Sequence, residues 1–124
     1  MKLLDTTVAI DYLRGREEAR DVVDRLALRE PILSSEVVRL EILAGARASE
    51  LRVIERFCSA LSWIPVDAEV SRTAGALARR YRASFSGIDD VDYLIAASAI
   101  VADADLLTTN TRHYPMFAAL EPAY

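Results

Sequence analysis

The chain has very few of the residues that build covalent cross-links and most transition-metal sites. Cys58 is its only cysteine, so an internal disulfide and a cysteine-built metal site are both excluded. Lys2 is the only lysine, and no glycine-rich loop ends in lysine, which excludes a P-loop nucleotide site. The apolar runs are short and interrupted by charge, and Asp5 comes too early for the apolar segment of a signal peptide. We therefore expect a cytoplasmic protein without a membrane-spanning segment.

The rest of the composition is typical of one folded domain over residues 1–124. The chain has 124 residues, of which 52% are hydrophobic, enough to bury a core and too many for a disordered segment. The net charge is −4, which is unusual for a protein that binds nucleic acid through a basic surface. A metal-dependent nuclease, however, needs concentrated acid at its centre. All the basic side chains except Lys2 are arginines, which reflects either codon usage or recognition of phosphate by guanidinium groups.

Short strands alternate with helices along the whole sequence. We expect strands at 2–4, 31–33, 63–66 and 106–108, and helices at 6–15, 17–29, 35–45, 50–61, 67–82 and 89–103. This order predicts an α/β fold with a parallel sheet covered by helices on both faces. Ligands bind such sheets outside the carboxyl ends of the strands. Asp5 lies at one such end, and the segment from Thr108 to Asn110 lies at another.

Three carboxylates occupy positions that a hydrophobic core would not favour. Asp5 follows a buried strand, Glu41 lies inside the apolar helix "VVRLEILAG", and Asp92 lies near the start of the apolar helix "VDYLIAA". Burying an unpaired carboxylate costs several kcal/mol, and neighbouring carboxylates repel one another. A divalent cation is the simplest way to neutralise them. Because the ligands are hard oxygens, the pattern favours Mg²⁺ or Mn²⁺ over zinc.

Two of these acids also have a simple structural explanation. Asp5 can cap the first helix, and Asp92 can form a capping box with Asp89. Glu41 has no capping role, because it lies in the middle of a helix, and none of the residues three or four positions away can pair with it. Capping therefore explains two of the acids singly but does not explain the set of three.

The stretches "LLDTTVAIDYLRG", "ILSSEVVRLEILAGAR", "DDVDYLIAASAIVADADLLTTN" and "TRHYPMF" resemble the PIN-domain ribonucleases. Within that family they are most similar to the VapC toxins of bacterial type II toxin–antitoxin systems. The resemblance covers essentially the whole chain and depends on the order and spacing of the motifs. It implies a three-layer α/β/α sandwich around a mostly parallel sheet of 4–5 short strands. It also implies that Asp5, Glu41 and Asp92 are the metal ligands.

The resemblance makes further site residues candidates. Thr6 corresponds to the hydroxyl residue that follows the first aspartate in the family. Asn110 stands in the segment where the family often has a fourth acid, and Asp90 is a candidate for supplying the missing charge. Arg112, beside Asn110, is a candidate for contacting phosphate. Thr6, Asn110 and Arg112 are thus expected to bind substrate or to support the metal ligands.

The activity that the resemblance implies is hydrolysis of RNA by water that a bound Mg²⁺ activates, with Mn²⁺ as a substitute. The expected products carry a 5′-phosphate and a 3′-hydroxyl, because water is the nucleophile. His113 is the only histidine, so no histidine pair is available for metal-free attack by the 2′-hydroxyl. We expect His113 to be structural or to lie at the edge of the groove. Arg14 and Arg16 are weaker candidates than Arg112 for phosphate contact.

The family resemblance also implies partners. VapC-like proteins form homodimers and are inhibited by a cognate VapB-type antitoxin, which presents a basic side chain to the acids. Two alternatives remain open at this stage. The chain can be a non-catalytic PIN-like binding module, or a receiver-like phosphoacceptor domain. The second needs a lysine near the carboxyl end of the sheet, and Lys2 is at the opposite end of its predicted strand.

Overall fold

The structure is a computed structural model that describes residues 1–124, and its centre is a sheet of four parallel strands. The strands are β1 (Lys2–Leu4), β2 (Ile32–Ser35), β3 (Ser62–Ile64) and β4 (Asp105–Leu107), and their order across the sheet is β3-β2-β1-β4. In the centre of the sheet, Leu3 pairs with Leu33 on one side and with Leu106 on the other. The predicted α/β class and parallel sheet are confirmed.

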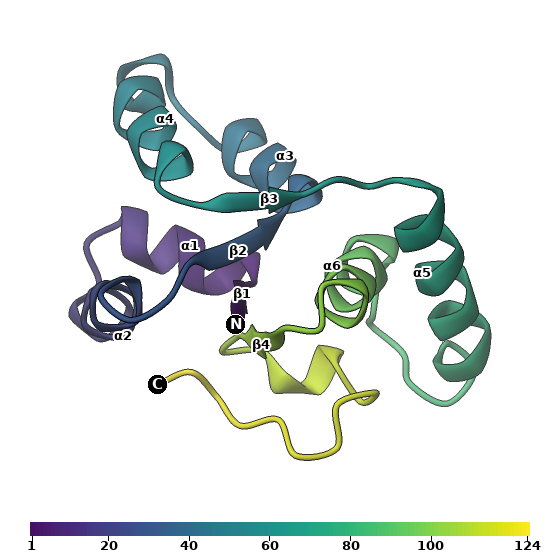
Figure 1. Ribbon diagram of the computed structural model, residues 1–124. Coiled ribbons are helices and arrows are strands. Elements are labelled where there is room, and N and C mark those ends of the chain that lie inside the picture. The colour runs from purple at the N-terminus through teal and green to yellow at the C-terminus, as the bar shows by residue number, and fades with distance from the viewer.

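Six helices surround the sheet (Figure 1). They are α1 (Thr6–Leu13), α2 (Glu17–Ala27), α3 (Glu36–Ala44), α4 (Leu51–Ser59), α5 (Ala68–Tyr81) and α6 (Asp90–Val101), with short 3₁₀ turns η1 (Ala48–Glu50) and η2 (Thr111–His113). In Figure 1, α1 and α2 lie on one side of the sheet and α6 on the other, with α5 packed outside α6. The arrangement is the expected three-layer α/β/α sandwich.

The side chains of β1 alternate between two cores, as the period of a strand requires. Leu3 packs with α6 residues such as Ile95 in the largest buried cluster. Leu4 points the other way and packs against Val8 of α1 and Val23 of α2. β1 is apolar on both faces, as a central strand is. Its burial therefore fixes the position of Asp5, the residue that follows it.

The strand ends and helix caps together place polar groups at one edge of the sheet. The Asp5 amide donates to the carbonyl of Leu107 at 2.9 Å, which extends the pairing of β1 with β4 by one residue. The carboxylate of Asp5 then accepts from the Thr6 amide and caps α1. Asp89 caps α6 in the same way, by accepting from the Asp92 amide. The capping roles expected of Asp5 and Asp89 are therefore both present.

Most predicted boundaries differ from the structure by one or two residues, and β2, for example, runs to Ser35 instead of ending at residue 33. The third strand ends at Ile64 and does not reach residue 66, because Pro65 has no amide to continue the ladder. The fourth helix begins at Leu51, after the separate turn η1. None of the helices combines the length and the apolar composition that a bilayer crossing requires.

Candidate active site

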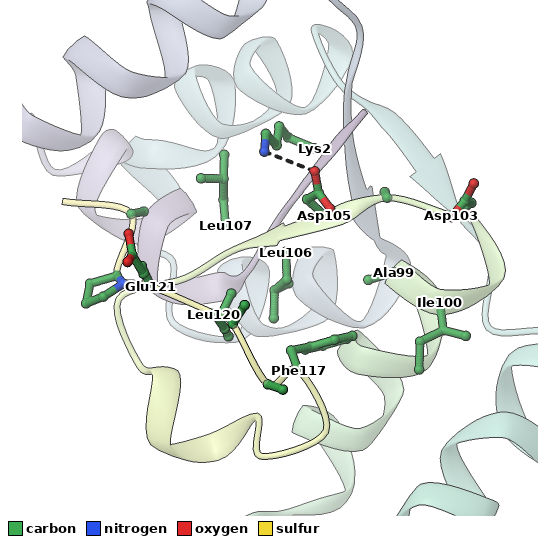
Figure 2. A pocket seen from close by; sticks show the side chains of 15 residues that line it. Lys2, Ala99, Ile100, Asp103, Asp105, Leu106, Leu107, Phe117, Leu120 and Glu121 are labelled. Atoms are coloured by element: carbon green, nitrogen blue, oxygen red, sulfur yellow. Dashed lines mark hydrogen bonds and ion pairs between the residues drawn. The ribbon is translucent and has the colours of Figure 1, made fainter.

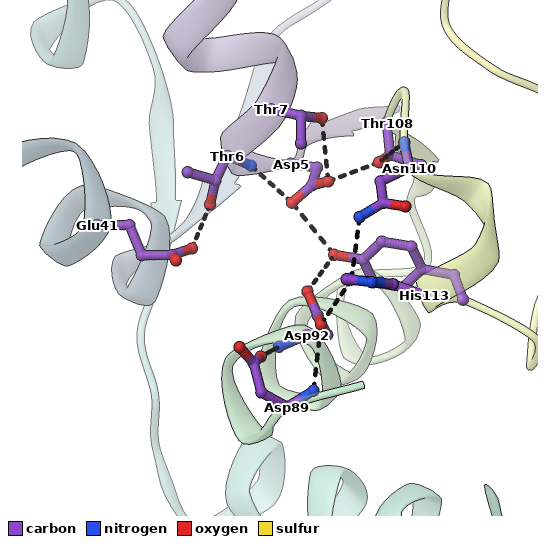
Figure 3. A network of polar contacts seen from close by, with 10 residues as sticks. Asp5, Thr6, Thr7, Glu41, Asp89, Asp92, Thr108, Asn110 and His113 are labelled. Atoms are coloured by element: carbon purple, nitrogen blue, oxygen red, sulfur yellow. Dashed lines mark hydrogen bonds and ion pairs between the residues drawn. The ribbon is translucent and has the colours of Figure 1, made fainter. Parts of the chain in front are cut away.

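Asp5 is the centre of a polar network at the carboxyl end of β1 (Figure 3). Its side chain is buried, with 3% of the residue exposed. Oδ1 accepts from the Thr6 amide at 2.7 Å and from the Tyr114 hydroxyl at 3.1 Å. Oδ2 accepts from the hydroxyls of Thr108 at 2.6 Å and Thr7 at 3.2 Å. Four donors thus satisfy both oxygens of this buried carboxylate, which is the condition for burying it at tolerable cost.

Glu41 faces this network from α3. The hydroxyl of Thr6 donates to Glu41 Oε1 at 2.5 Å, while the amide of Thr6 donates to Asp5. One threonine therefore connects two of the predicted acids through two different groups. Glu41 is half-buried, and its side chain is directed at the start of α1. It is therefore neither fully exposed to solvent nor part of the hydrophobic core.

Asp92 reaches the same network from the first turn of α6. Its Oδ1 lies 3.4 Å from the Tyr114 hydroxyl, and its Oδ2 lies 2.9 Å from Nδ1 of His113. Tyr114 therefore contacts Asp92 and Asp5 with one hydroxyl. Nδ1 of His113 also lies 3.0 Å from Nδ2 of Asn110, and one ring nitrogen can donate to Asp92 or accept from the amide, but not both at once.

The surroundings change the acidity of two of these groups. Burial is the main cause that raises the pKa of Asp92 to about 6; the charges of Asp89 and Asp5 act in the same direction, and a backbone hydrogen bond from Asp89 and the nearby His113 act against it. Burial, followed by the charges of Asp5 and Asp92, raises the pKa of Tyr114 far above its usual range. Tyr114 thus remains protonated and acts as a hydrogen-bond donor between the two acids.

The raised pKa of Asp92 predicts a pH dependence of metal binding. Below about pH 6 Asp92 carries a proton, and a neutral carboxyl is a poor ligand that must release this proton before a cation binds. We expect the dissociation constant for Mn²⁺ to increase about tenfold for each pH unit below pH 6 and to level off above pH 7. Titration calorimetry at pH 5, 6, 7 and 8 measures this. An affinity that is constant from pH 5 to pH 7 would exclude Asp92 as a ligand.

The three predicted acids are brought together through shared donors rather than by direct contact. No three Asp, Glu, His or Cys side chains lie close enough to form a ready-made metal site. Instead, Tyr114 joins Asp5 to Asp92, and Thr6 joins Asp5 to Glu41. The candidate metal ligands of the three acids are all carboxylate oxygens. Such a set suits Mg²⁺, which commonly binds one or two carboxylates and keeps several of its waters.

Asp90 does not join the site. Its side chain is 84% exposed and forms an ion pair with Arg82, because Asp90 and Asp92 leave the first turn of α6 in different directions. The suggestion that Asp90 supplies the missing charge therefore needs correction. Asn110 does lie beside the network, where its amide donates to Thr108 Oγ1 at 2.9 Å and its side chain contacts His113.

The three candidate arginines differ in their surroundings. Arg112 is exposed on η2, beside the network, and forms no ion pair. Arg16 is already engaged by Asp11 and Glu18. Arg14 has no acidic partner. The guanidinium groups of Arg112 and Arg14 are therefore free to bind phosphate, whereas that of Arg16 is not.

Sequence reasoning did not count three members of the network among the site residues. Thr108 follows β4 just as Asp5 follows β1, so the parallel pairing of these strands was a usable signal. Tyr114 and His113 gave no such signal, because they reach the acids from the short turn η2 and the residue that follows it. His113, expected to be structural or to lie at the edge of the groove, is a direct partner of Asp92.

A separate hollow of about 630 Å³ lies between α6, β4 and the C-terminal segment (Figure 2). Lys2 and Asp105 form an ion pair at its rim, and these residues begin β1 and β4. The acids of the network follow the opposite ends of the strands. None of the hollow's lining residues belongs to the network, so the two features are distinct.

Comparison with known proteins identifies the family. Residues 2–117 match the PIN domain. The chain is 58% identical to ribonuclease VapC19 of Mycobacterium tuberculosis over 125 residues, and the alignment spans the full length of both. The chain belongs to the VapC group of the PIN-domain family. It is also 39% identical to ribonuclease VapC10 of the same organism over 124 residues, which cover all of this chain and 93% of VapC10.

Solved structures of other proteins share the fold. A toxin–antitoxin complex from Klebsiella pneumoniae matches with a TM-score of 0.82 at 23% identity, covering 100% of this chain and 98% of that one. VapBC2 from Rickettsia felis, bound to a DNA fragment from its promoter, matches with a TM-score of 0.82 at 22% identity, covering 96% and 94%. These matches support the three-layer VapC fold independently of the sequence relatives.

Proposed function

We propose that the protein is the toxin of a type II toxin–antitoxin pair and acts as a Mg²⁺- or Mn²⁺-dependent endoribonuclease. The observation that carries this proposal is the convergence of Asp5, Glu41 and Asp92, from three distant segments, on one network of shared hydroxyl donors. The relatives named as ribonucleases support the reaction. The resemblance to VapBC complexes supports inhibition by a VapB-type antitoxin.

The role that we propose for each residue follows from its contacts. Asp5 and Asp92 hold the cation, and Glu41, oriented by Thr6, completes the acidic side of the site. A bound Mg²⁺ would supply an acidified water and neutralise charge on the phosphate. The hydroxyl of Tyr114 lies within hydrogen-bond distance of both aspartates and helps to hold them in position, donating its one proton to Asp5 or to Asp92.

Three further features belong to the proposal. His113 holds the second oxygen of Asp92 by donating to it from Nδ1. Arg112, exposed and unpaired on η2, contacts the RNA backbone. The protein acts in the cytoplasm as a homodimer, and its acidic network receives a basic side chain of the antitoxin when no metal is bound.

Cleavage of RNA by the purified protein tests the proposal. Protein freed of any antitoxin should cleave RNA in Mg²⁺ or Mn²⁺, stop in EDTA, and resume when excess metal is restored. The fragments should carry a 5′-phosphate, and ligation to an adaptor that requires this group measures it. Cleavage that continues in EDTA would contradict the metal assignment. Binding of RNA without any cleavage in metal would favour a non-catalytic binding module.

A further inference from the structure

The last residues of the chain form a strap across the edge of the sheet. Residues 117–124, here called the C-terminal strap, pass the edge strand β4 and end on the side of the sheet where α1 and α2 lie (Figure 1). Residues 117–123 line the hollow of about 630 Å³ that separates the strap from β4 and α6 (Figure 2). Because the strap spans this hollow, the position of its end depends on the contacts of residues 123 and 124.

Two hydrogen bonds hold the end of the strap, and they lead to different elements. The Ala123 amide donates to the carbonyl of Thr108, directly after β4, at 2.8 Å. The hydroxyl of the neighbouring Tyr124 donates to Asp11 Oδ2, on α1, at 2.5 Å. The guanidinium carbon of Arg16 lies 5.1 Å from the centroid of the Tyr124 ring and adds a cation–π contact. The strap therefore joins α1 to the segment that follows β4.

The hydroxyl of Tyr124 is well suited to hold this connection. The ring is half-buried and packs against the cluster that contains Leu4 and Val8. Burial, followed by the hydrogen bond to Asp11, raises the pKa of Tyr124 above its usual range. The hydroxyl therefore stays protonated at neutral pH and donates to Asp11.

α1 and the segment after β4 are also the two elements that hold Oδ2 of Asp5. The Thr7 hydroxyl reaches this oxygen from the first turn of α1, and the Thr108 hydroxyl reaches it from the end of β4. The Thr109 amide donates to Thr7 Oγ1 at 3.3 Å, which connects the same two elements inside the network. A change in the separation of these elements would therefore move the two donors of Asp5 apart.

We propose that Tyr124 is a positioning residue for the proposed metal site. Its hydroxyl clamps α1 to the strap, and the strap holds Thr108, so that Thr7 and Thr108 keep the Asp5 carboxylate in place for the cation. This inference rests on the proposed function, because it assumes that Asp5 is a metal ligand. The polar contacts of Tyr124 itself are with Asp11 and Arg16 and not with the acids of the network.

Binding of Mn²⁺ tests the positioning role without depending on cleavage. Titration calorimetry at pH 7.5 compares the native protein with Tyr124→Phe, which keeps the ring beside Arg16 and removes only the hydroxyl. We expect the dissociation constant for Mn²⁺ to increase about three- to tenfold. This change is smaller than the 10- to 100-fold loss that is typical when a direct partner of a metal ligand is removed. An unchanged dissociation constant would overturn the proposal.

Tyr12→Phe is the matched control. Tyr12 is a second half-buried tyrosine whose hydroxyl donates to an aspartate, in this case Asp24 of α2, at 2.6 Å. It joins α1 to α2 and not to the segment after β4. Tyr12→Phe should therefore lower the melting temperature, as Tyr124→Phe does, but should bind Mn²⁺ like the native protein. An equal loss of Mn²⁺ affinity in the two variants would make Tyr124 a general stabiliser of α1 and contradict a positioning role.

A double substitution tests whether the hydroxyl acts through α1. Asp11→Ala removes the acceptor of the Tyr124 hydroxyl, so the double variant Asp11→Ala, Tyr124→Phe should bind Mn²⁺ no more weakly than Asp11→Ala alone. Asp11→Asn keeps an oxygen that can accept from the hydroxyl and should restore part of the affinity that Asp11→Ala loses. Losses of affinity that multiply in the double variant would show that the two residues act independently, against the proposed clamp.

Cleavage assays give a second measurement of the same role. In Tyr124→Phe the Mn²⁺ concentration that gives half of the maximal rate should rise by the factor found in calorimetry, whereas KM for RNA at saturating Mn²⁺ should stay the same. If the native protein cleaves RNA but Tyr124→Phe binds Mn²⁺ normally, the positioning role is wrong and the nuclease assignment stands. If Mn²⁺ affinity depends on Tyr124 but no RNA is cleaved, the positioning role stands and the nuclease assignment is wrong.

Discussion

Replacing Asp92 by asparagine should reduce RNA cleavage by a factor on the order of 10³ while leaving the protein folded. Asparagine keeps an oxygen that can accept from the Asp89 amide, so the cap of α6 is preserved. It removes the charge that a cation at Asp5 and Asp92 requires. Initial cleavage rates at saturating Mg²⁺, measured with the native and variant proteins, give the effect.

The same substitution should change stability in the direction opposite to activity. Because burial raises the pKa of Asp92 to about 6, its ionised form disfavours the folded state above that pH. Without metal at pH 7.5, Asp92→Asn should therefore melt at the same temperature as the native protein or at a higher one. With metal, only the native protein should gain stability, because binding to the folded state raises its melting temperature.

Asp105→Asn is the matched control for this experiment. Asp105 is 78% exposed and paired with Lys2, at the opposite end of the strands from the network. Its substitution should change neither the cleavage rate nor the metal-dependent gain in melting temperature. Native-like cleavage by the Asp92→Asn protein would show that the α6 acid serves only as a cap.

Tyr114→Phe should lower both the stability and the activity of the protein. The hydroxyl of Tyr114 is the one group that contacts both Asp5 and Asp92, and only 1% of the residue is exposed. Its removal leaves a buried carboxylate oxygen short of a donor, at a cost of about 1–3 kcal/mol. We expect cleavage to fall by about 10- to 100-fold, as when other supporting partners of metal ligands are lost. Thermal melting and cleavage rates measure the two effects.

Tyr93→Phe controls for the loss of a buried hydroxyl as such. Tyr93 is also 1% exposed, but its hydroxyl has no hydrogen-bond partner. Removing it should therefore leave stability unchanged or improve it, and should not affect cleavage. The stability lost in Tyr114→Phe should be partly restored by Mn²⁺, because the cation replaces the bridge between Asp5 and Asp92. Equal behaviour of the two variants would mean that the bridge has no role.

Much of the fold follows from local patterns in the sequence. Apolar residues at positions 2–4, 31–33 and 106–108 alternate with helical segments, and this order gives the parallel sheet and its two helical layers. Asp5 was also predictable, because the carboxyl ends of parallel strands are where ligands bind. Glu41 could be selected because a carboxylate inside an apolar helix lacks a local partner.

The connections between the acids could not be read from the sequence in the same way. Tyr114 is 109 positions from Asp5, and its segment has no regular period that fixes the direction of its side chain. Asp90 remained a candidate for the missing charge until α6 was placed, because the direction of each side chain depends on how the helix packs. Exact positions at irregular segments depend on long-range packing, which local patterns do not contain.

The most direct test of the account is to locate Mn²⁺ in crystals by its anomalous scattering. The account predicts one peak in the acidic network, within about 2.0–2.3 Å of carboxylate oxygens of both Asp5 and Asp92 and on the side that faces Glu41. A protein that cleaves RNA with its only Mn²⁺ peak elsewhere, such as beside Asp90 or Asp105, would contradict the central claim.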